Sequence, residues 1–368
     1  MASRDKVRVG IVGAGFIGHL HAEALARVPN AEVVAIASPS PEKGKALADS
    51  FGIPRHFTDY REMLALDGLA MVTVGVPNDL HASVCIAAAE AGKHVVCEKP
   101  LCLTLAEADR IIAAGRDAGV KMMYAEELIF APKYVRAKQL VDEGALGQVF
   151  VVKQSEEHDG PHSPWFWDVR RSGGGVLLDM GCHSIAFCRW VFGNRPVARV
   201  SATMGTFVHG GKTRGEDHAV CVLTFEGGGI GLCENSWAKG GGVDDKAEIY
   251  GSRGNTRADL LRGSSLTTFS ETGYGYAVEK AATTTGWTFT MYEESWNYGF
   301  PQEMRHFVDC VQKDEPPLVT AEDGRAVLEI VYAAYLSAGS GRAVDLPLDP
   351  IPDVAVPIDL WLGAATGG

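Results

Sequence analysis

Three side chains in this sequence have the types and surroundings needed for proton transfer to or from a hydroxyl oxygen: Lys99, Asp179 and His183. Lys99 follows the predicted strand 94–98, so it stands where a buried strand is expected to end. Asp179 and His183 are four residues apart, a spacing that puts both on one face of a helix. Because the pKa of histidine is near neutral, His183 is predicted as the acid or base, with Lys99 as proton relay and oxyanion stabiliser and Asp179 as the orienting group.

The stretch 7–18 predicts a nucleotide-binding turn. Its apolar residues suit a buried parallel strand, and Gly13, Gly15 and Gly18 follow at Gly-x-Gly-x-x-Gly spacing. Gly13 allows a tight turn, Gly15 lets the backbone approach a pyrophosphate, and Gly18 lets the next helix pack closely. The amides and the dipole at the start of that helix favour anions. We therefore predict dinucleotide binding rather than an ordinary tight turn.

The second predicted strand, 31–37, ends at Ser38. An acidic residue at this tip would bind the adenosine ribose and exclude a 2′-phosphate. Because neither Asp nor Arg adjoins Ser38, the cofactor is predicted as NAD or NADP. Ligands of open parallel sheets bind at the carboxyl ends of the strands. Further cofactor contacts are accordingly expected from Phe16, Ile17, Ser38, Pro77, Asn78, His81, Glu98 and Lys99.

Strands and helices alternate through the first part of the chain, which predicts a Rossmann domain with a doubly wound parallel sheet over 1–126. Residues 127–368 are predicted as an α/β domain with a large open, mainly antiparallel sheet, because strand-like runs there follow one another across glycine turns. The strands are expected at 7–12, 31–37, 55–57, 70–76, 94–98, 120–124, 148–154, 197–207, 219–225, 230–237, 247–250 and 265–269, and helices at 42–51, 60–66, 80–91, 105–118, 134–143, 302–312 and 322–337.

The segment 156–170 mixes aromatic and short polar residues, which suits a loop that binds a sugar: rings stack on its apolar faces and polar groups take its hydroxyls. Packing of the tryptophans in a core is the alternative. A metal site is not expected, since the loop lacks a third ligand motif. Substrate contacts are predicted from Lys99, Glu126, His158, His162, Trp165, Trp167, Asp179 and His183.

The totals exclude several classes of function. Lys plus Arg number 34 against 46 for Asp plus Glu, a formal net charge of −12, so the protein should repel nucleic acid and anionic membranes. No apolar run approaches the roughly 18 residues that span a bilayer, and the first residues lead straight into a strand without a secretion signal. The eight scattered cysteines favour reduced thiols in the cytoplasm. We expect a cytoplasmic protein that binds neither nucleic acid nor a membrane.

Five motifs, in this order and spacing, resemble the glucose-fructose oxidoreductase / inositol dehydrogenase / rhizopine-catabolism (Gfo/Idh/MocA) family. They are the glycine turn at Gly13, Pro77-Asn78-x-x-His81, Gly92-Lys93-His94-Val95 with Glu98-Lys99-Pro100, Gly173-Gly174-Gly175 with Asp179-x-x-x-His183, and the run from Glu248 to Gly254. The resemblance implies NAD(P)-dependent oxidation or reduction of a sugar or cyclitol carbinol, with Lys99 as catalytic lysine and Asp179 and His183 as the acid/base pair. It also implies a homo-oligomer, dimer or tetramer, joined through the C-terminal sheet. Ala186 stands where many members carry a further aspartate.

Three functions remain open at this point. The first is a dehydrogenase of a ring hydroxyl in a sugar, glycoside or cyclitol. The second is a glycosidase or lyase that uses the nicotinamide transiently through a 3-keto sugar, with Glu126, Glu157 or His158 as the extra base. The third is a sensor without catalysis, although a sensor has no need of Lys99 and His183.

Overall fold

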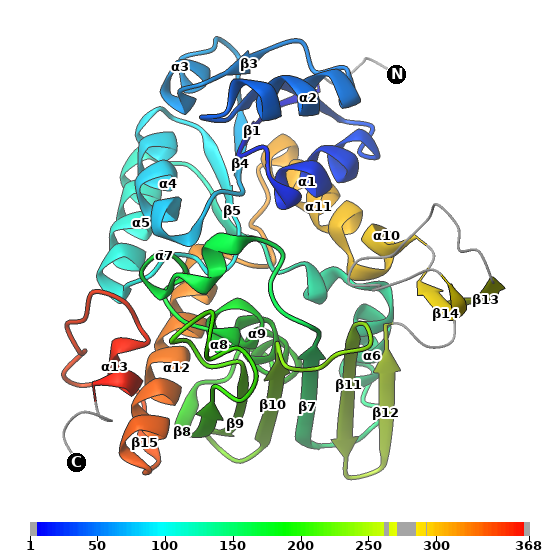
Figure 1. The fold of residues 1–368 in the computed structure, drawn as a ribbon, viewed down its shortest axis with the longest axis vertical. Coiled ribbons are helices and arrows are strands. Elements are labelled where there is room, and N and C mark those ends of the chain that lie inside the picture. Colours follow the sequence, from blue (N-terminus) through cyan, green and yellow to red (C-terminus); the bar gives the residue numbers. More distant parts are fainter. Residues whose placement is uncertain (1–5, 261–264, 271–284, 292, 364–368) are drawn as a thin grey trace. The chain divides into compact units, whose positions relative to one another are not determined.

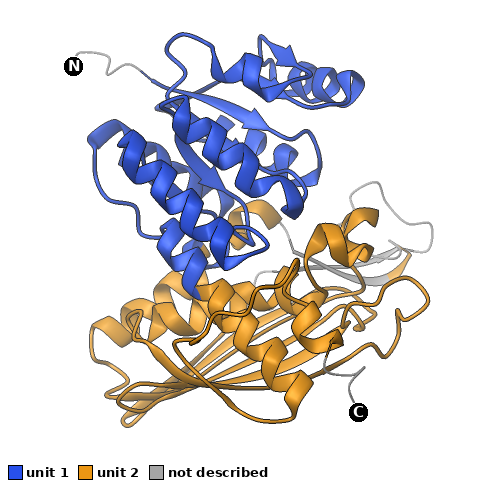
Figure 2. Cartoon of the chain, turned by 90° about the vertical axis from the view of Figure 1, so that its left-hand side faces the viewer, with its two compact units in different colours: residues 1–130, 299–326 blue, residues 131–298, 327–368 orange. Residues whose placement is uncertain are grey.

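The computed structural model describes residues 6–260, 265–270, 285–291 and 293–363. The chain forms two compact units, and Figure 2 colours them separately. Unit 1 comprises Met1–Phe130 and Gly299–Ala326, and unit 2 comprises Ala131–Tyr298 and Val327–Gly368. The return of residues 299–326 to unit 1 was not foreseen from the sequence. The division into domains 1–126 and 127–368 stays a prediction, because compactness within one chain does not test independent folding.

Unit 1 contains a six-stranded parallel sheet in the order β3-β2-β1-β4-β5-β6. This is the doubly wound arrangement that the alternating pattern predicted. The apolar strands β1, β4 and β5 occupy the centre, where both faces of a strand are covered. The strands are β1 (Val7–Val12), β2 (Ala31–Ala37), β3 (His56–Phe57), β4 (Met71–Val74), β5 (His94–Cys97) and β6 (Met122–Tyr124).

Helices cover this sheet, with α4 and α5 on one side and α1 with α11 on the other (Figure 1). Their ends follow the sequence: Thr104 and Glu107 form a capping box at the start of α5, and Gly119 ends it in the left-handed conformation. The helices of unit 1 are α1 (Phe16–Ala26), α2 (Pro41–Phe51), α3 (Tyr60–Leu64), α4 (His81–Glu90), α5 (Leu105–Ala118) and α11 (Phe300–Lys313), with 3₁₀ turns at Asn78–Leu80 and Glu127–Phe130.

Unit 2 contains a seven-stranded sheet in the order β12-β11-β7-β10-β9-β8-β15. Only the β7 and β10 pair is parallel among its described pairings, so the sheet is mixed but mainly antiparallel. The strands are β7 (Val149–Glu157), β8 (Val197–Gly205), β9 (His218–Phe225), β10 (Ile230–Ser236), β11 (Asp244–Gly251), β12 (Gly254–Asp259) and β15 (Val344–Asp345). A separate hairpin pairs β13 (Ser265–Ser270) with β14 (Gly286–Met291).

The helix α9 packs on β7 and β10, and Figure 2 shows the helices of unit 2 gathered on one face of the sheet. This packing buries the alternate residues of the strands and forms the core of the unit. The helices are α6 (Pro132–Asp142), α7 (Val169–Ser172), α8 (Val176–Asp179), α9 (Gly181–Val191), α10 (Glu294–Tyr298), α12 (Ala321–Ser340) and α13 (Asp359–Leu362), with a 3₁₀ turn at Pro164–Trp167. The first six residues of α12 belong to unit 1.

Two further features of the sequence, its cysteines and the length of its apolar segments, can be compared with the structure. All eight cysteines are buried free thiols. Among the residues that the structure describes, no helix combines the length and the apolar character that crossing a membrane requires.

Candidate functional site

The glycine turn of unit 1 has the geometry that its spacing predicted. Gly13 has φ +112°, and a Cβ atom there would lie 2.1 Å from the carbonyl oxygen of Gly75. A Cβ on Gly18 would lie 2.2 Å from the carbonyl oxygen of Gly13, so the helix can approach the strand only with glycine at this position. Gly15 is different, because a Cβ there would meet no described heavy atom within 4 Å. The open side of Gly15 leaves room for a phosphate group.

The helix α1 starts directly after this turn. Gly15 is its N-cap, no side chain of the described residues caps it, and no acidic residue lies in its first turn. Phe16 and Ile17 are its first two residues, and Phe16 is exposed. An uncapped helix N-terminus beside an open glycine is a site for an anion such as a pyrophosphate. The residues present therefore fit a dinucleotide.

Ser38 is buried directly after β2. Its Oγ accepts a long hydrogen bond of 3.4 Å from the Ser40 backbone N–H, and the Ser40 hydroxyl in turn accepts one of 3.3 Å from the Lys43 N–H at the start of α2. The turn after β2 is thus ordered by serine hydroxyls rather than by an aspartate. This arrangement does not distinguish NAD from NADP as the cofactor.

The chain after β4 continues through Pro77 and the buried Asn78 to His81. The two ring nitrogens of His81 lie 2.7 Å from the carbonyl oxygen of Pro100 and 2.9 Å from that of Val76. Burial lowers the pKa of His81, and the two carbonyl groups counter this only in part. His81 therefore connects the turn after β4 with the turn after β5, and its contact with a cofactor stays a prediction.

Lys99 follows Glu98 at the end of β5 and is half-buried. The Glu98 carboxylate is buried, lies 2.8 Å from Nε2 of His21 on α1, and accepts a hydrogen bond of 3.2 Å from the Lys99 backbone N–H. Burial raises the pKa of Glu98, but His21 and Lys99 together bring it below its ordinary value. His21 was missed from the sequence; its position three residues after Gly18, on the face of α1 turned to the sheet, was the available signal.

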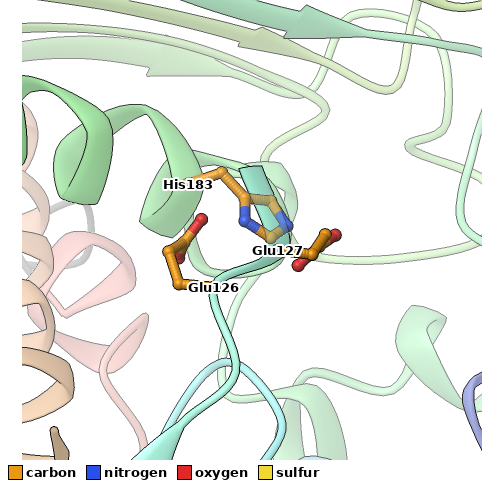
Figure 3. A group of neighbouring side chains, drawn as sticks. All are labelled: Glu126, Glu127 and His183. Carbon is orange, nitrogen blue, oxygen red and sulfur yellow. The ribbon is translucent and has the colours of Figure 1, made fainter. Parts of the chain in front are cut away.

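Two more acidic side chains, Glu126 and Glu127, follow β6 and are buried (Figure 3). Glu303 on α11 is buried with them in unit 1, and neither of its carboxylate oxygens has a hydrogen-bond partner among the described residues. Burial raises the pKa of Glu303 well above its ordinary value, and the negative charges of Glu127, Glu98 and Glu126 raise it further. Unit 1 thus contains a buried group of carboxyl side chains of which the sequence analysis identified only Glu98 and Glu126.

Asp179 and His183 do not share one continuous helix, so that part of the prediction is wrong. Asp179 ends α8, and Met180 lies between the helices. His183 is the third residue of α9, and its side chain is drawn in Figure 3. The hydrogen bond from the Met180 N–H to the Val176 carbonyl closes the first helix, and the His183 N–H bonds the Met180 carbonyl in the tighter i to i−3 pattern. Both side chains are buried.

The Asp179 carboxylate accepts a hydrogen bond of 3.0 Å from the indole Nε1–H of Trp237. Trp237 is fully buried directly after β10. Its ring contacts Trp167 edge to face, with centroids 5.5 Å apart, and Phe166 with centroids 6.3 Å apart. The sequence analysis did not identify this partner, because 58 residues separate the donor from the acceptor.

The predicted substrate loop forms an aromatic cluster in unit 2. Trp165 stacks on Phe166 with centroids 3.8 Å apart. The ring of Trp167 lies against the ring of His209, with centroids 5.0 Å apart. The Lys212 ammonium lies 5.1 Å from the centroid of the Trp167 ring.

The two histidines of the loop differ in exposure: His158 is buried and His162 exposed, with ring centroids 5.8 Å apart. Both tryptophans are half-buried, so they are neither free in solvent nor fully within the core. The structure thus brings Trp167 and Asp179 together through Trp237. His209 and Lys212, by contrast, were not identified from the sequence.

Comparisons with known proteins identify the family. Residues 7–126 match the oxidoreductase family with an NAD-binding Rossmann fold (GFO_IDH_MocA), and residues 134–257 match the GFO/IDH/MocA C-terminal domain. The chain belongs to this family, as its motifs predicted. It is an NAD(P)-dependent oxidoreductase acting on CH–OH groups.

Three relatives span nearly the whole chain. The myo-inositol 2-dehydrogenase of Thermotoga maritima is 30% identical over 92% of this chain and 98% of its own length. The structure of GenD2 from gentamicin A biosynthesis in complex with NAD has a TM-score of 0.88 and 33% identity, covering 94% of this chain and 97% of that chain. Levoglucosan dehydrogenase in complex with NADH and levoglucosan has a TM-score of 0.78 and 26% identity, covering 94% and 100%.

Proposed function

We propose that this enzyme transfers a hydride between the nicotinamide of NAD or NADP and a ring carbon that bears a secondary hydroxyl in a sugar, glycoside or cyclitol. The relatives support this substrate class, since their names include myo-inositol, scyllo-inositol, levoglucosan and D-apiose dehydrogenases. The observation that carries the proposal is the hydrogen bond from Trp237 to Asp179. It fixes a buried carboxylate beside aromatic rings, a combination suited to a polyhydroxylated ring.

The reaction requires the hydroxyl proton to leave as the hydride departs. We assign this proton to His183, whose ordinary pKa suits a base at neutral pH. The ammonium of Lys99 stabilises the developing alkoxide, and as a relay it would pass one of its own protons to His183 while it takes up the hydroxyl proton; Asp179 orients the histidine or a substrate hydroxyl. The nicotinamide, when bound, supplies the hydride acceptor, and every proton is handled by side chains of this chain.

Within unit 1 we propose that Gly13, Gly15, Phe16, Ile17 and Gly18 hold the pyrophosphate and that Ser38 lies against the adenosine ribose. Pro77, Asn78, His81 and Glu98 are proposed as further cofactor contacts beside Lys99. The fit of the glycine turn to a phosphate supports these assignments. The proposed substrate contacts are Lys99, Glu126, His158, His162, Trp165, Trp167, Asp179 and His183.

A screen of cyclitols, aldoses and glycosides tests the proposal. Each compound is incubated with enzyme and with NAD⁺ or NADP⁺, and formation of reduced cofactor is followed by absorbance. The expected result is net reduction with at least one member of the class, and its loss in Lys99→Ala. Failure of every compound with both cofactors would overturn the proposal.

The same screen includes the redox-cycling alternative as an outcome. A glycosidase or lyase that oxidises a sugar and reduces it again would consume a glycoside without net formation of NADH or NADPH. Product analysis by chromatography on the glycoside samples distinguishes this outcome. The comparisons favour dehydrogenases over this reaction.

We also propose a cytoplasmic homo-oligomer, a dimer or tetramer, joined through the sheet of unit 2. Phe150 on β7 and Ile230 on β10 expose large apolar side chains, which supports association through the strands. Light scattering coupled to size exclusion tests the assembly. A monomer at micromolar concentration would contradict it.

A further inference from the structure

Glu216 is a fully buried carboxylate that lies against the first turn of α8. Its Oε1 accepts a hydrogen bond of 2.9 Å from the Leu177 N–H, and its Oε2 accepts one of 3.2 Å from the Gly175 N–H. Its backbone carbonyl accepts another, of 2.9 Å, from the Val176 N–H. One residue therefore holds three successive amides at the start of the helix that ends in Asp179.

Tyr335 on α12 completes this contact. Its hydroxyl, also fully buried, donates a hydrogen bond of 2.9 Å to Oε1 of Glu216. A Cβ on Gly174 would lie 2.0 Å from the Tyr335 hydroxyl oxygen, and a Cβ on Gly175 would lie 2.0 Å from the Glu216 carbonyl oxygen. Glycine before α8 is therefore required for the close approach of the Tyr335 side chain and of the Glu216 backbone.

The next residue, Asp217, positions Trp237, whose indole contacts Asp179. Its carboxylate accepts three hydrogen bonds of 2.7 Å from the backbone N–H groups of residues 207–209. Its backbone carbonyl accepts a hydrogen bond of 2.8 Å from the Trp237 N–H, and the Trp237 indole donates to Asp179. Two adjacent acidic residues thus fix both the helix that carries Asp179 and the indole that binds its carboxylate.

We propose that Glu216 is a positioning residue for the acid–base pair Asp179 and His183, and that it acts by holding α8 against Trp237. This inference rests on the proposed function, which makes that pair the reacting groups. The helix α8 has only four residues. A single turn has no stability of its own, so its orientation depends on the groups that bind its backbone.

The ionisation of Glu216 falls in the neutral range. Burial raises its pKa to about 7, although the amides of Leu177 and Gly175 and the Tyr335 hydroxyl oppose this. Within the described part of the chain, the titratable groups that face it are Tyr335 from α12 and Cys221 from β9, and neither is a cation. Protonation would weaken the hydrogen bonds to α8, because a neutral carboxyl group is a poorer acceptor than a carboxylate.

Steady-state kinetics on Glu216→Gln and Tyr335→Phe test the inference, with Glu226→Gln, an exposed glutamate of the same unit, as the matched control. We expect kcat to fall about tenfold in both variants, the effect of one hydrogen bond to a charged group, while the Kd for NADH is unchanged. Wild-type kcat in Tyr335→Phe, or a loss of NADH affinity as large as the loss of kcat, would overturn the inference. If Glu216→Gln does not fold, Tyr335→Phe alone decides.

The indole N–H resonance of Trp237 gives a readout that does not depend on catalysis. The resonance is assigned by its absence in Trp237→Phe and is then followed as the pH is changed. Two titratable groups contact Trp237: Asp179, at its indole N–H, and His209, at its backbone carbonyl. We expect Glu216→Gln and Tyr335→Phe to shift the resonance and Glu226→Gln to leave it unchanged. An unshifted resonance in both would refute the positioning role. A shift in an enzyme that oxidises no sugar or cyclitol would support the positioning role and refute the proposed function instead.

Discussion

The glycine turn in unit 1 and the Asp179 region in unit 2 are built in different ways. The first is made from backbone: three glycines within six residues, a helix N-terminus, and a neighbouring turn that comes within 2.1 Å of a Cβ on Gly13. The second is made from buried side chains of residues that are far apart in the chain, among them Glu216, Trp237 and Tyr335. A site made from backbone depends on a few adjacent residues, which can be recognised in the sequence. A site made from side chains depends on residues distributed over the whole unit.

The largest effect is expected for His183, which we proposed as the acid or base. His183→Ala should lower kcat by about 10²-fold or more, the usual contribution of a general acid or base, and leave the Kd for NADH unchanged. Stopped-flow or steady-state assays with titration of NADH measure both values. His218→Ala, a half-buried histidine of the same unit, is the control. A wild-type rate in His183→Ala would remove this residue from the mechanism.

Substitutions in the glycine turn should affect stability and cofactor binding rather than kcat alone. Gly13→Ala forces a side chain onto a carbonyl oxygen at positive φ, so we expect it to destabilise unit 1 by about 3 kcal/mol or more and to abolish NADH binding. Gly15→Ala is the matched control, since a Cβ there meets open space among the described residues. It should keep the wild-type unfolding transition and lose only affinity for NADH. Chemical denaturation and NADH titration separate the two, and equal stability of Gly13→Ala and wild type would contradict the backbone account.

A smaller effect is expected where one hydrogen bond supports the side-chain site. Trp237→Phe keeps the aromatic ring but removes the donor to Asp179, so kcat should fall about tenfold with little change in NADH affinity. Trp296→Phe, an exposed tryptophan of unit 2, should behave as wild type. If Trp237→Phe and Trp296→Phe have the same kcat, the indole does not hold Asp179 in a productive position.

The smallest effect concerns stability in unit 1. The pKa of Glu303 is raised in the folded state, so the unfolded chain releases its proton first and stability falls as pH rises above the ordinary glutamate pKa. The loss is at most about 1.4 kcal/mol per pH unit. Glu303→Gln does not ionise, so its free energy of unfolding should fall less than that of wild type between mildly acidic and neutral pH. Parallel pH dependences in urea denaturation would show that the buried carboxyl is already compensated.

The same contrast explains what the sequence could predict. The strand, the glycines and the helix of the cofactor turn are adjacent, so their spacing alone indicated the fold of unit 1 and its ligand. Lys99 was proposed as a catalytic residue because it stands just after a predicted buried strand, and this role stays a prediction. The break between α8 and α9 was missed because it depends on Glu216, which holds the start of α8, and on Met180, which closes its end. No local pattern marks Trp237 or Tyr335 as partners, since each reaches its contact across a long stretch of chain.

The return of residues 299–326 to unit 1 has a consequence for how such enzymes can be recombined. The polypeptide passes from one unit to the other three times, so a single cut after residue 130 leaves α11 attached to the wrong fragment. The helix α11 packs on α1, directly behind the glycine turn. Exchange of unit 2 with the corresponding part of a relative therefore needs three matched breakpoints, after residues 130, 298 and 326, and a chimera with one breakpoint would carry a foreign α11 in its unit 1.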